Sequence, residues 1–179
     1  DADMSLCCGG WRSAETTFNM LTQVIGRAGR GDSEGSAVIQ TMVPEHKVIT
    51  LAAKQDYDSF YELELQLRRA QSCPPFGHAA GITFLGQDEG QVLRGAAKLR
   101  DSLVACLKEP AYAGENCHVL GPAPCVVPKI NYNYRYRLTL RCRMTRQLRG
   151  LIAHLLRQFL KDGANRGVSA FVDVNGMDE

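Results

Sequence analysis

The chain has 179 residues, of which 45% are hydrophobic and 22% are charged, and its formal net charge is +2. This composition is typical of a globular protein and excludes a disordered or low-complexity chain. Because no apolar run approaches the ~20 residues of a membrane span and no signal-peptide pattern is present, we expect a cytoplasmic protein that does not contact a membrane.

The cysteines and histidines do not form the pattern of a metal site. The seven cysteines are odd in number and include no C-x-x-C pair, and the four histidines are scattered singly. Zinc sites and disulfide frameworks need closely spaced or paired ligands. We therefore expect reduced thiols and no metal in this chain.

The first segment with a clear helical pattern is 13–29, with Ser13 as its N-cap. Its apolar face consists of Phe18, Leu21, Ile25 and Ala28. The β-branched run 36–42 predicts a strand, and 45–54 predicts a short helix.

A second clear helix is predicted over 56–71, before a proline-rich break. Asp56 is its expected cap, and Phe60, Leu63 and Leu67 are its expected buried face. The segment CPPFG at 73–77 interrupts both helix and strand, because proline lacks an N–H and restricts the preceding residue. We expect two domains, 1–72 and 73–179.

The second domain alternates strands with helices. The predicted elements are a strand over 78–86, a helix capped by Asp88 over 88–108, a short strand over 117–124 running into a loop, a strand over 133–143, a helix capped by Thr145 over 145–161 and a strand over 168–174. This β-α-β-β-α-β order is that of ferredoxin-like α+β domains.

The segment QVIGRAGR carries a row of polar side chains at the end of the first helix. Gln23, Arg27 and Arg30 lie within about 60° of one another on a helix. Gly26 and Gly29 allow another backbone or a ligand to approach closely. Guanidinium groups match phosphate oxygens, so the row suits a triphosphate. The alternative is an exposed helix end with two solvated arginines.

A second basic region includes no acidic residue. Its members are Lys129, Arg135, Arg137, Arg141, Arg143, Arg146 and Arg149. On a strand, the four arginines at 135–143 share one face, and the apolar residues between them share the other. We expect an exposed arginine ladder that binds a phosphate backbone, with Tyr132 stacking on bases. The alternative is a solvated polar sheet face.

Several motifs resemble those of one helicase family. QVIGRAGR is similar to motif VI of superfamily 2 helicases, and VIQTMVPEH, CPPFGH, VLGPAP and VDVN resemble the PriA family of replication-restart helicases along essentially the whole chain. The resemblance implies that 1–72 completes the second RecA-like lobe and that 73–179 is a ribosomal protein S10-like domain. It also implies that Arg30 is an arginine finger, that Arg27 contacts the γ-phosphate and that Gln23 supports the nucleotide.

The resemblance further implies cofactors and partners. These are ATP and Mg²⁺ in the full-length protein, zinc only in a region outside this chain, forked and single-stranded DNA, the acidic tail of single-stranded-DNA-binding protein, and primosome proteins. Arg146 or Arg149 could receive that tail. The expected location is the bacterial nucleoid.

The chain contains no G-x-x-x-x-G-K-[ST] phosphate loop. We therefore expect this part to be inactive alone and the full-length protein to be an ATP-dependent helicase. The alternative is a non-catalytic, S10-like module that binds nucleic acid or protein.

Overall fold

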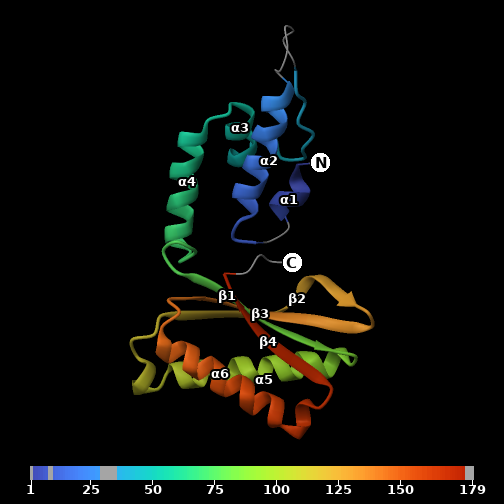
Figure 1. The fold of residues 1–179 in the computed structure, drawn as a ribbon, viewed down its shortest axis with the longest axis vertical. Coiled ribbons are helices and arrows are strands. Elements are labelled where there is room, and N and C mark those ends of the chain that lie inside the picture. Colours follow the sequence, from blue (N-terminus) through green and yellow to red (C-terminus); the bar gives the residue numbers. More distant parts are fainter. Residues whose placement is uncertain (1, 8–9, 29–35, 176–179) are drawn as a thin grey trace. The chain divides into compact units, whose positions relative to one another are not determined.

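The computed structural model describes residues 2–7, 10–28 and 36–175 (Figure 1). Internal contacts divide the chain into two compact units between Ala70 and Gln71. No described helix is long and apolar enough to cross a membrane.

The described part of the first unit contains four helices around a small aromatic core. They are α1 (Asp3–Cys7), α2 (Ser13–Ala28), α3 (Lys47–Ala53) and α4 (Tyr57–Ala70). The rings of Phe18 and Phe60 stack with centroids 4.0 Å apart, and Leu21, Val48 and Ile49 are buried beside them. This contact joins α2 to α4 and confirms the buried positions of Phe18, Leu21 and Phe60.

The helix ends of this unit are set by local hydrogen bonds. The amide of Ser59 donates to Asp56 Oδ1 at 3.1 Å, which confirms the predicted cap of α4. Nδ1 of His46 accepts from the amide of Val48 at 3.3 Å at the start of α3. The predicted cap of α2 was wrong by one residue, because the carbonyl of Arg12 already accepts from Thr16 and Ser13 lies inside the helix.

Two further predictions for this unit were wrong. Leu67 is 45% exposed, because α3 is half as long as α4 and covers only part of it. Residues 36–42 form no strand, because the described residues of this unit offer no second strand with which they could pair. Asp3 holds this segment instead, accepting from the Thr41 hydroxyl at 2.5 Å and from the Met42 amide at 2.6 Å.

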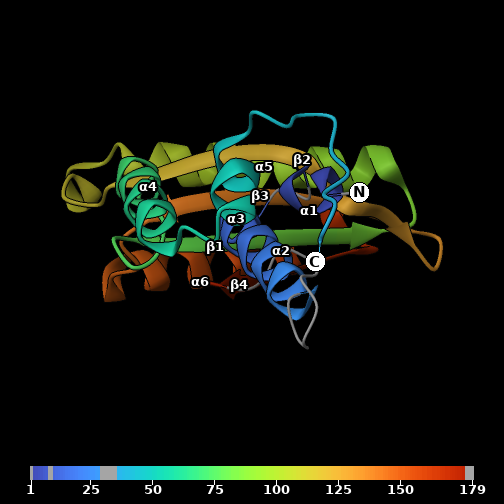
Figure 2. The same cartoon turned by 90° about the horizontal axis from the view of Figure 1, so that it is seen from above.

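The second unit confirms the predicted β-α-β-β-α-β order. Its elements are β1 (His78–Gly86), α5 (Glu89–Leu107), β2 (Cys117–Ile130), β3 (Asn133–Cys142), α6 (Arg146–Lys161) and β4 (Val168–Val174). The strand order is β2-β3-β1-β4, and every neighbouring pair is antiparallel. Both helices cover one face of this sheet, with α5 beneath β2 and β3 and α6 beneath β4 (Figures 1 and 2).

The core of the second unit lies between the sheet and the two helices. Phe84 of β1 meets Phe159 of α6 edge to face, with ring centroids 5.4 Å apart. Asp88 caps α5 by accepting from the amide of Gln91 at 2.7 Å, and Thr145 caps α6 by accepting from the amide of Leu148 at 3.0 Å. Both predicted caps are therefore confirmed.

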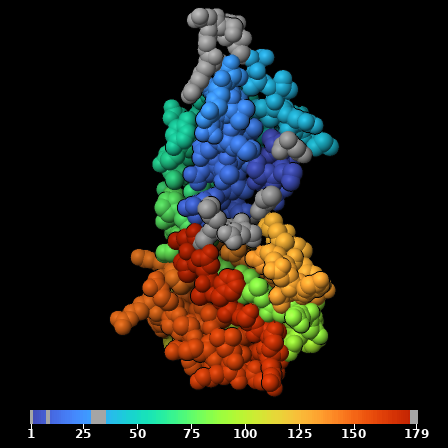
Figure 3. Space-filling view, turned by 45° about the vertical axis from the view of Figure 1, so that its right-hand side comes forward, coloured from blue at the N-terminus to red at the C-terminus, as the bar shows by residue number. Residues whose placement is uncertain are grey.

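The edge strand β2 is longer than predicted. The prolines at 122, 124 and 128 favoured a loop, but β2 continues to Ile130 with register shifts between Leu120 and Ala123 and between Pro124 and Lys129. Proline is tolerated on an edge strand, where its missing N–H faces away from the sheet. The opposite edge, β4, lies at the surface of the unit (Figure 3).

Candidate nucleotide and nucleic-acid surfaces

The exposed side of α2 carries two of the three polar residues expected to face a nucleotide. Gln23 and Arg27 are both exposed and one helical turn apart. A Cβ added at Gly26 would meet nothing nearer than Gln55 Nε2 at 4.0 Å, so the backbone between them is open. Arg30 and Gly29 lie outside the described residues. This part of α2 therefore presents a cation, an amide and accessible backbone on one surface.

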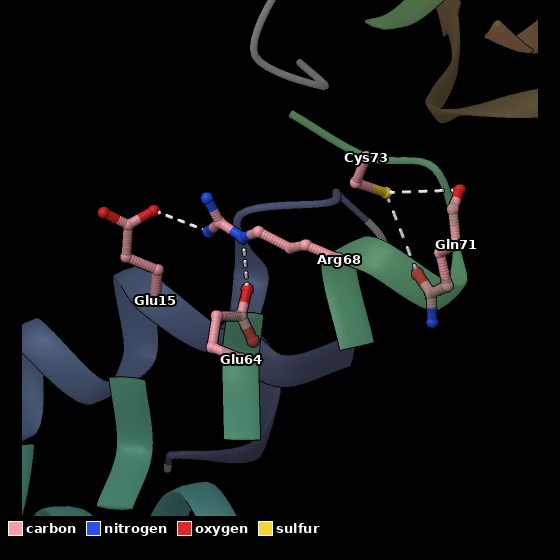
Figure 4. A network of polar contacts seen from close by, with 5 residues as sticks. All are labelled: Glu15, Glu64, Arg68, Gln71 and Cys73. Carbon is pink, nitrogen blue, oxygen red and sulfur yellow. Dashed lines mark hydrogen bonds and ion pairs between the residues drawn. The ribbon is translucent and has the colours of Figure 1, made fainter. Parts of the chain in front are cut away.

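A half-buried arginine links α2 to α4. Arg68 donates from Nη2 to Glu15 Oε2 and from Nε to Glu64 Oε1, each at 2.8 Å (Figure 4). Its guanidinium also lies 4.8 Å from the centre of the Trp11 ring. Burial would lower the pKa of Arg68, but the hydrogen bonds to the two glutamates raise it above its usual value. The ion pair from Arg68 to Glu15 thus fixes the N-terminal end of α2, the helix that carries Gln23 and Arg27, against α4.

The arginines of β3 are less exposed than predicted. Leu138, Leu140 and Cys142 face the core as expected, but the arginines between and before them are half-buried: Arg135, Arg137 and Arg141. A Cβ on Gly81 of β1 would overlap the guanidinium of Arg137, so that side chain lies across the sheet. Arg143 is exposed but follows the end of β3. The prediction of an exposed ladder was therefore wrong for three of its four members. For Arg137 the reason is that Gly81 leaves room for its side chain to lie flat on the sheet.

The turn between β2 and β3 presents exposed polar and aromatic groups. Tyr132 is 82% exposed at the tip of the hairpin. The ammonium of Lys129 lies 4.2 Å from the centre of the Tyr134 ring and donates to its hydroxyl at 3.2 Å. Arg146 and Arg149 are exposed in the first turn of α6. These four predicted residues are available to a ligand.

A cavity of about 590 Å³ lies beside the end of β3 within the second unit. It is lined by residues from 72–77, 114–118 and 141–145. Nη1 of Arg141 is buried and has no hydrogen-bond partner among the described residues. Sequence reasoning missed this cavity, because its walls come from three segments that are far apart in the chain.

No group of three or more histidine, cysteine, aspartate or glutamate side chains is placed to hold a metal ion within the part of the chain that the structure describes. Two of the histidines have structural contacts instead. His46 caps α3, and Nδ1 of His78 accepts from the amide of Met144 at 3.2 Å.

Comparison with known proteins places the chain in a family. A family model described as "Primosomal protein N C-terminal domain" matches residues 69–177, which is the second unit almost from end to end. The chain belongs to the PriA family. The replication restart protein PriA of Bacillus subtilis is 34% identical over 174 residues, which is 97% of this chain and 21% of that protein.

Other PriA proteins match a shorter part of the chain. The replication restart protein PriA of Rickettsia conorii is 35% identical over 140 residues, covering 78% of this chain and 20% of that protein. That of Synechocystis is 35% identical over 143 residues, covering 78% and 16%. The chain therefore spans about a fifth of the length of the curated PriA proteins that it matches.

Proposed function

We propose that this chain supplies the end of the second helicase lobe and the C-terminal domain of an ATP-dependent helicase that restarts replication. The observation that supports this most is the match of residues 69–177 to the C-terminal domain of PriA, together with the sequence motif QVIGRAGR at 23–30. In this proposal the first unit contacts the nucleotide, and the second unit binds DNA and protein partners.

In this proposal, Gln23, Arg27 and Arg30 face the phosphates of ATP. Gln23 and Arg27 fit that role, because they are exposed and one turn apart beside open backbone at Gly26. ATP with Mg²⁺ supplies the phosphoryl group, and an arginine finger stabilises the negative charge that grows as it transfers. The phosphate loop, the Mg²⁺ ligands and a zinc-binding region would come from other parts of the full-length protein.

Steady-state ATP hydrolysis by the full-length protein tests the arginine finger. Arg30→Ala should lower kcat by about 10³-fold or more, because arginine fingers contribute on that scale. Its affinity for DNA should stay within twofold of the unmodified protein. Lys54→Ala removes an exposed cation from the same unit and should leave both measurements unchanged. ATP hydrolysis that survives Arg30→Ala would rule out this assignment.

The proposed DNA surface consists of basic residues on β2, β3, the segment after β3 and α6. They are Lys129, Arg135, Arg137, Arg141, Arg143, Arg146 and Arg149, with Tyr132 available for stacking. Cations that neutralise phosphates release condensed counterions, so binding should weaken steeply as salt rises. Forked and single-stranded DNA are the proposed ligands.

Fluorescence anisotropy of this chain with labelled forked DNA tests the surface. The triple variant Arg135→Ala, Arg146→Ala and Arg149→Ala should reduce the slope of log K against log salt by about 2 to 3, at roughly 0.7–0.9 per lost phosphate contact. The matched control is Arg94→Ala, Lys108→Ala and Arg157→Ala, which removes the same charge from exposed positions on or just beyond α5 and on α6. If the two triple variants have the same slope of log K against log salt, net charge alone accounts for the effect, and the proposed surface is contradicted.

The same basic surface suits acidic protein partners. The exposed Arg146 and Arg149 are available to the acidic tail of single-stranded-DNA-binding protein, and other primosome proteins are proposed partners of this domain. A second candidate function, a non-catalytic binding module, is favoured by the complete hydrophobic core of the second unit. In that case the arginines of the second unit would matter and Arg30 would not.

A further inference from the structure

The cavity beside the end of β3 combines groups that recognise different parts of a nucleotide. Phe76, Glu115, His118, Arg141, Arg143 and Thr145 are among its lining residues. Its volume of about 590 Å³ lies within the range of small-molecule sites, roughly 300–1,000 Å³. The space is therefore sufficient for more than a single inorganic ion.

The strongest indication of a ligand is one unpaired nitrogen in the guanidinium of Arg141. Nη1 is buried without a hydrogen-bond partner in the described structure, and His118 lies directly opposite on β2. Leaving a buried donor unpaired costs about 1–3 kcal/mol, and more when the group is charged. Arg143 lines the same cavity. An anionic group with several acceptor oxygens would satisfy Arg141 and neutralise both cations.

The remaining walls suit an aromatic base and a sugar. Phe76 is 41% exposed, and aromatic side chains stack on nucleobases. Glu115 is half-buried and accepts from the hydroxyl of Thr145 at 2.5 Å, which holds its carboxylate in place. That carboxylate can accept from a sugar hydroxyl or a base amine.

We propose that this cavity binds a nucleotide carrying a terminal phosphate. Arg141 and Arg143 hold the phosphate, Phe76 stacks on the base, and Glu115 accepts from the sugar or the base. A terminal phosphate fits this site better than an internal one. A cavity can enclose the end of a strand, whereas an internal phosphate needs an open groove through which the strand continues on both sides. The choice of a nucleotide rests on the proposed nucleic-acid function of the domain, and the ligand is either a phosphorylated strand end or a free mononucleotide.

Isothermal titration calorimetry of the 179-residue chain with 2′-deoxyadenosine 5′-monophosphate tests the site, with 2′-deoxyadenosine as the probe that lacks the phosphate. The phosphorylated probe should bind at least tenfold more tightly. Arg141→Met should remove that preference, and Phe76→Ala should weaken binding of both probes. Arg157→Met is the matched control, because it removes an exposed arginine of α6 that does not line the cavity, and it should change affinity by less than twofold.

The outcomes separate this site from the DNA surface. Equal affinity for the two probes, no binding of either, or no effect of both cavity variants would overturn the proposal. Should Arg141→Met fail to fold by circular dichroism, Phe76→Ala still decides it. Tighter binding of a 5′-phosphorylated oligonucleotide than of its 5′-hydroxyl form would identify the strand end as the ligand, and equal binding would identify the free nucleotide. The triple variant at Arg135, Arg146 and Arg149 changes no residue that lines the cavity, so it should bind the mononucleotide normally even if DNA binding is abolished.

Discussion

Replacing Arg68 with methionine should destabilise the first unit. Methionine preserves most of the aliphatic packing but removes two charge-assisted hydrogen bonds of 2.8 Å, to Glu15 and Glu64. Hydrogen bonds to charged groups contribute about 1.5–3 kcal/mol each when buried. Because the Glu15 side chain is 43% exposed, its share is reduced by solvent screening. We expect a loss of about 2–3 kcal/mol in the free energy of unfolding.

The fluorescence of Trp11 can report this loss selectively. Trp11 is the only tryptophan in the chain, it belongs to the first unit, and Arg68 lies against its ring. Urea unfolding followed at this residue should show a lower midpoint in Arg68→Met. Adding Glu64→Gln should recover part of the loss, because it removes the carboxylate left unpaired. Glu62→Gln, a change of one exposed charge on the same helix, should cost less than about 0.5 kcal/mol. If Arg68→Met is no more costly than Glu62→Gln, the network does not anchor α2.

Three further predictions concern the second unit. Phe84→Ala should lower the free energy of unfolding by about 3–5 kcal/mol, measured by urea unfolding followed by circular dichroism, because it opens a cavity against Phe159. The control Phe171→Ala, at a site 50% exposed, should cost far less. Similar losses in the two variants would contradict the packing of Phe84 against Phe159. Asp88→Ala and Thr145→Ala should each cost about 1 kcal/mol, and the double variant should show the sum, since the caps belong to different helices; a markedly smaller sum would show that the caps are coupled. Hydrogen bonds from Lys98 and from the Ala164 amide lower the pKa of Asp162 below its ordinary value of 3.8, so its contribution to stability is present above that pH and is lost as the pH falls through the lowered pKa. The difference in the free energy of unfolding between the unmodified chain and Asp162→Asn should therefore shrink on acidification. A constant difference would exclude this cause.

The parts of the fold that sequence predicted well are governed by local rules. The bounds of 78–86 and 168–174 were correct, because these mostly apolar runs end at glycine or turn segments. The caps at Asp56, Asp88 and Thr145 were correct for the same reason, since each involves an amide only three residues away. These features need no knowledge of distant residues.

The errors occurred where distant residues decide the outcome. The segment 36–42 has strand propensity but no described strand beside it, and Asp3 holds it instead. Arg137 lies flat because Gly81, on another strand, leaves the space. The cavity at Arg141 is assembled from three separate segments. Propensity and periodicity describe only a residue's neighbours in sequence, so none of these arrangements could be derived from them.

The broken register of β2 has a consequence for association between copies of the protein. This edge strand exposes apolar side chains at Leu120, Val126, Val127 and Ile130, which would ordinarily invite another strand to pair with it. Its three prolines cannot donate backbone hydrogen bonds, and its register shifts interrupt a flat ladder. A second copy therefore finds no continuous row of donors and acceptors along this edge. The exposed apolar side chains of this hairpin therefore do not lead to edge-to-edge pairing between copies of the domain.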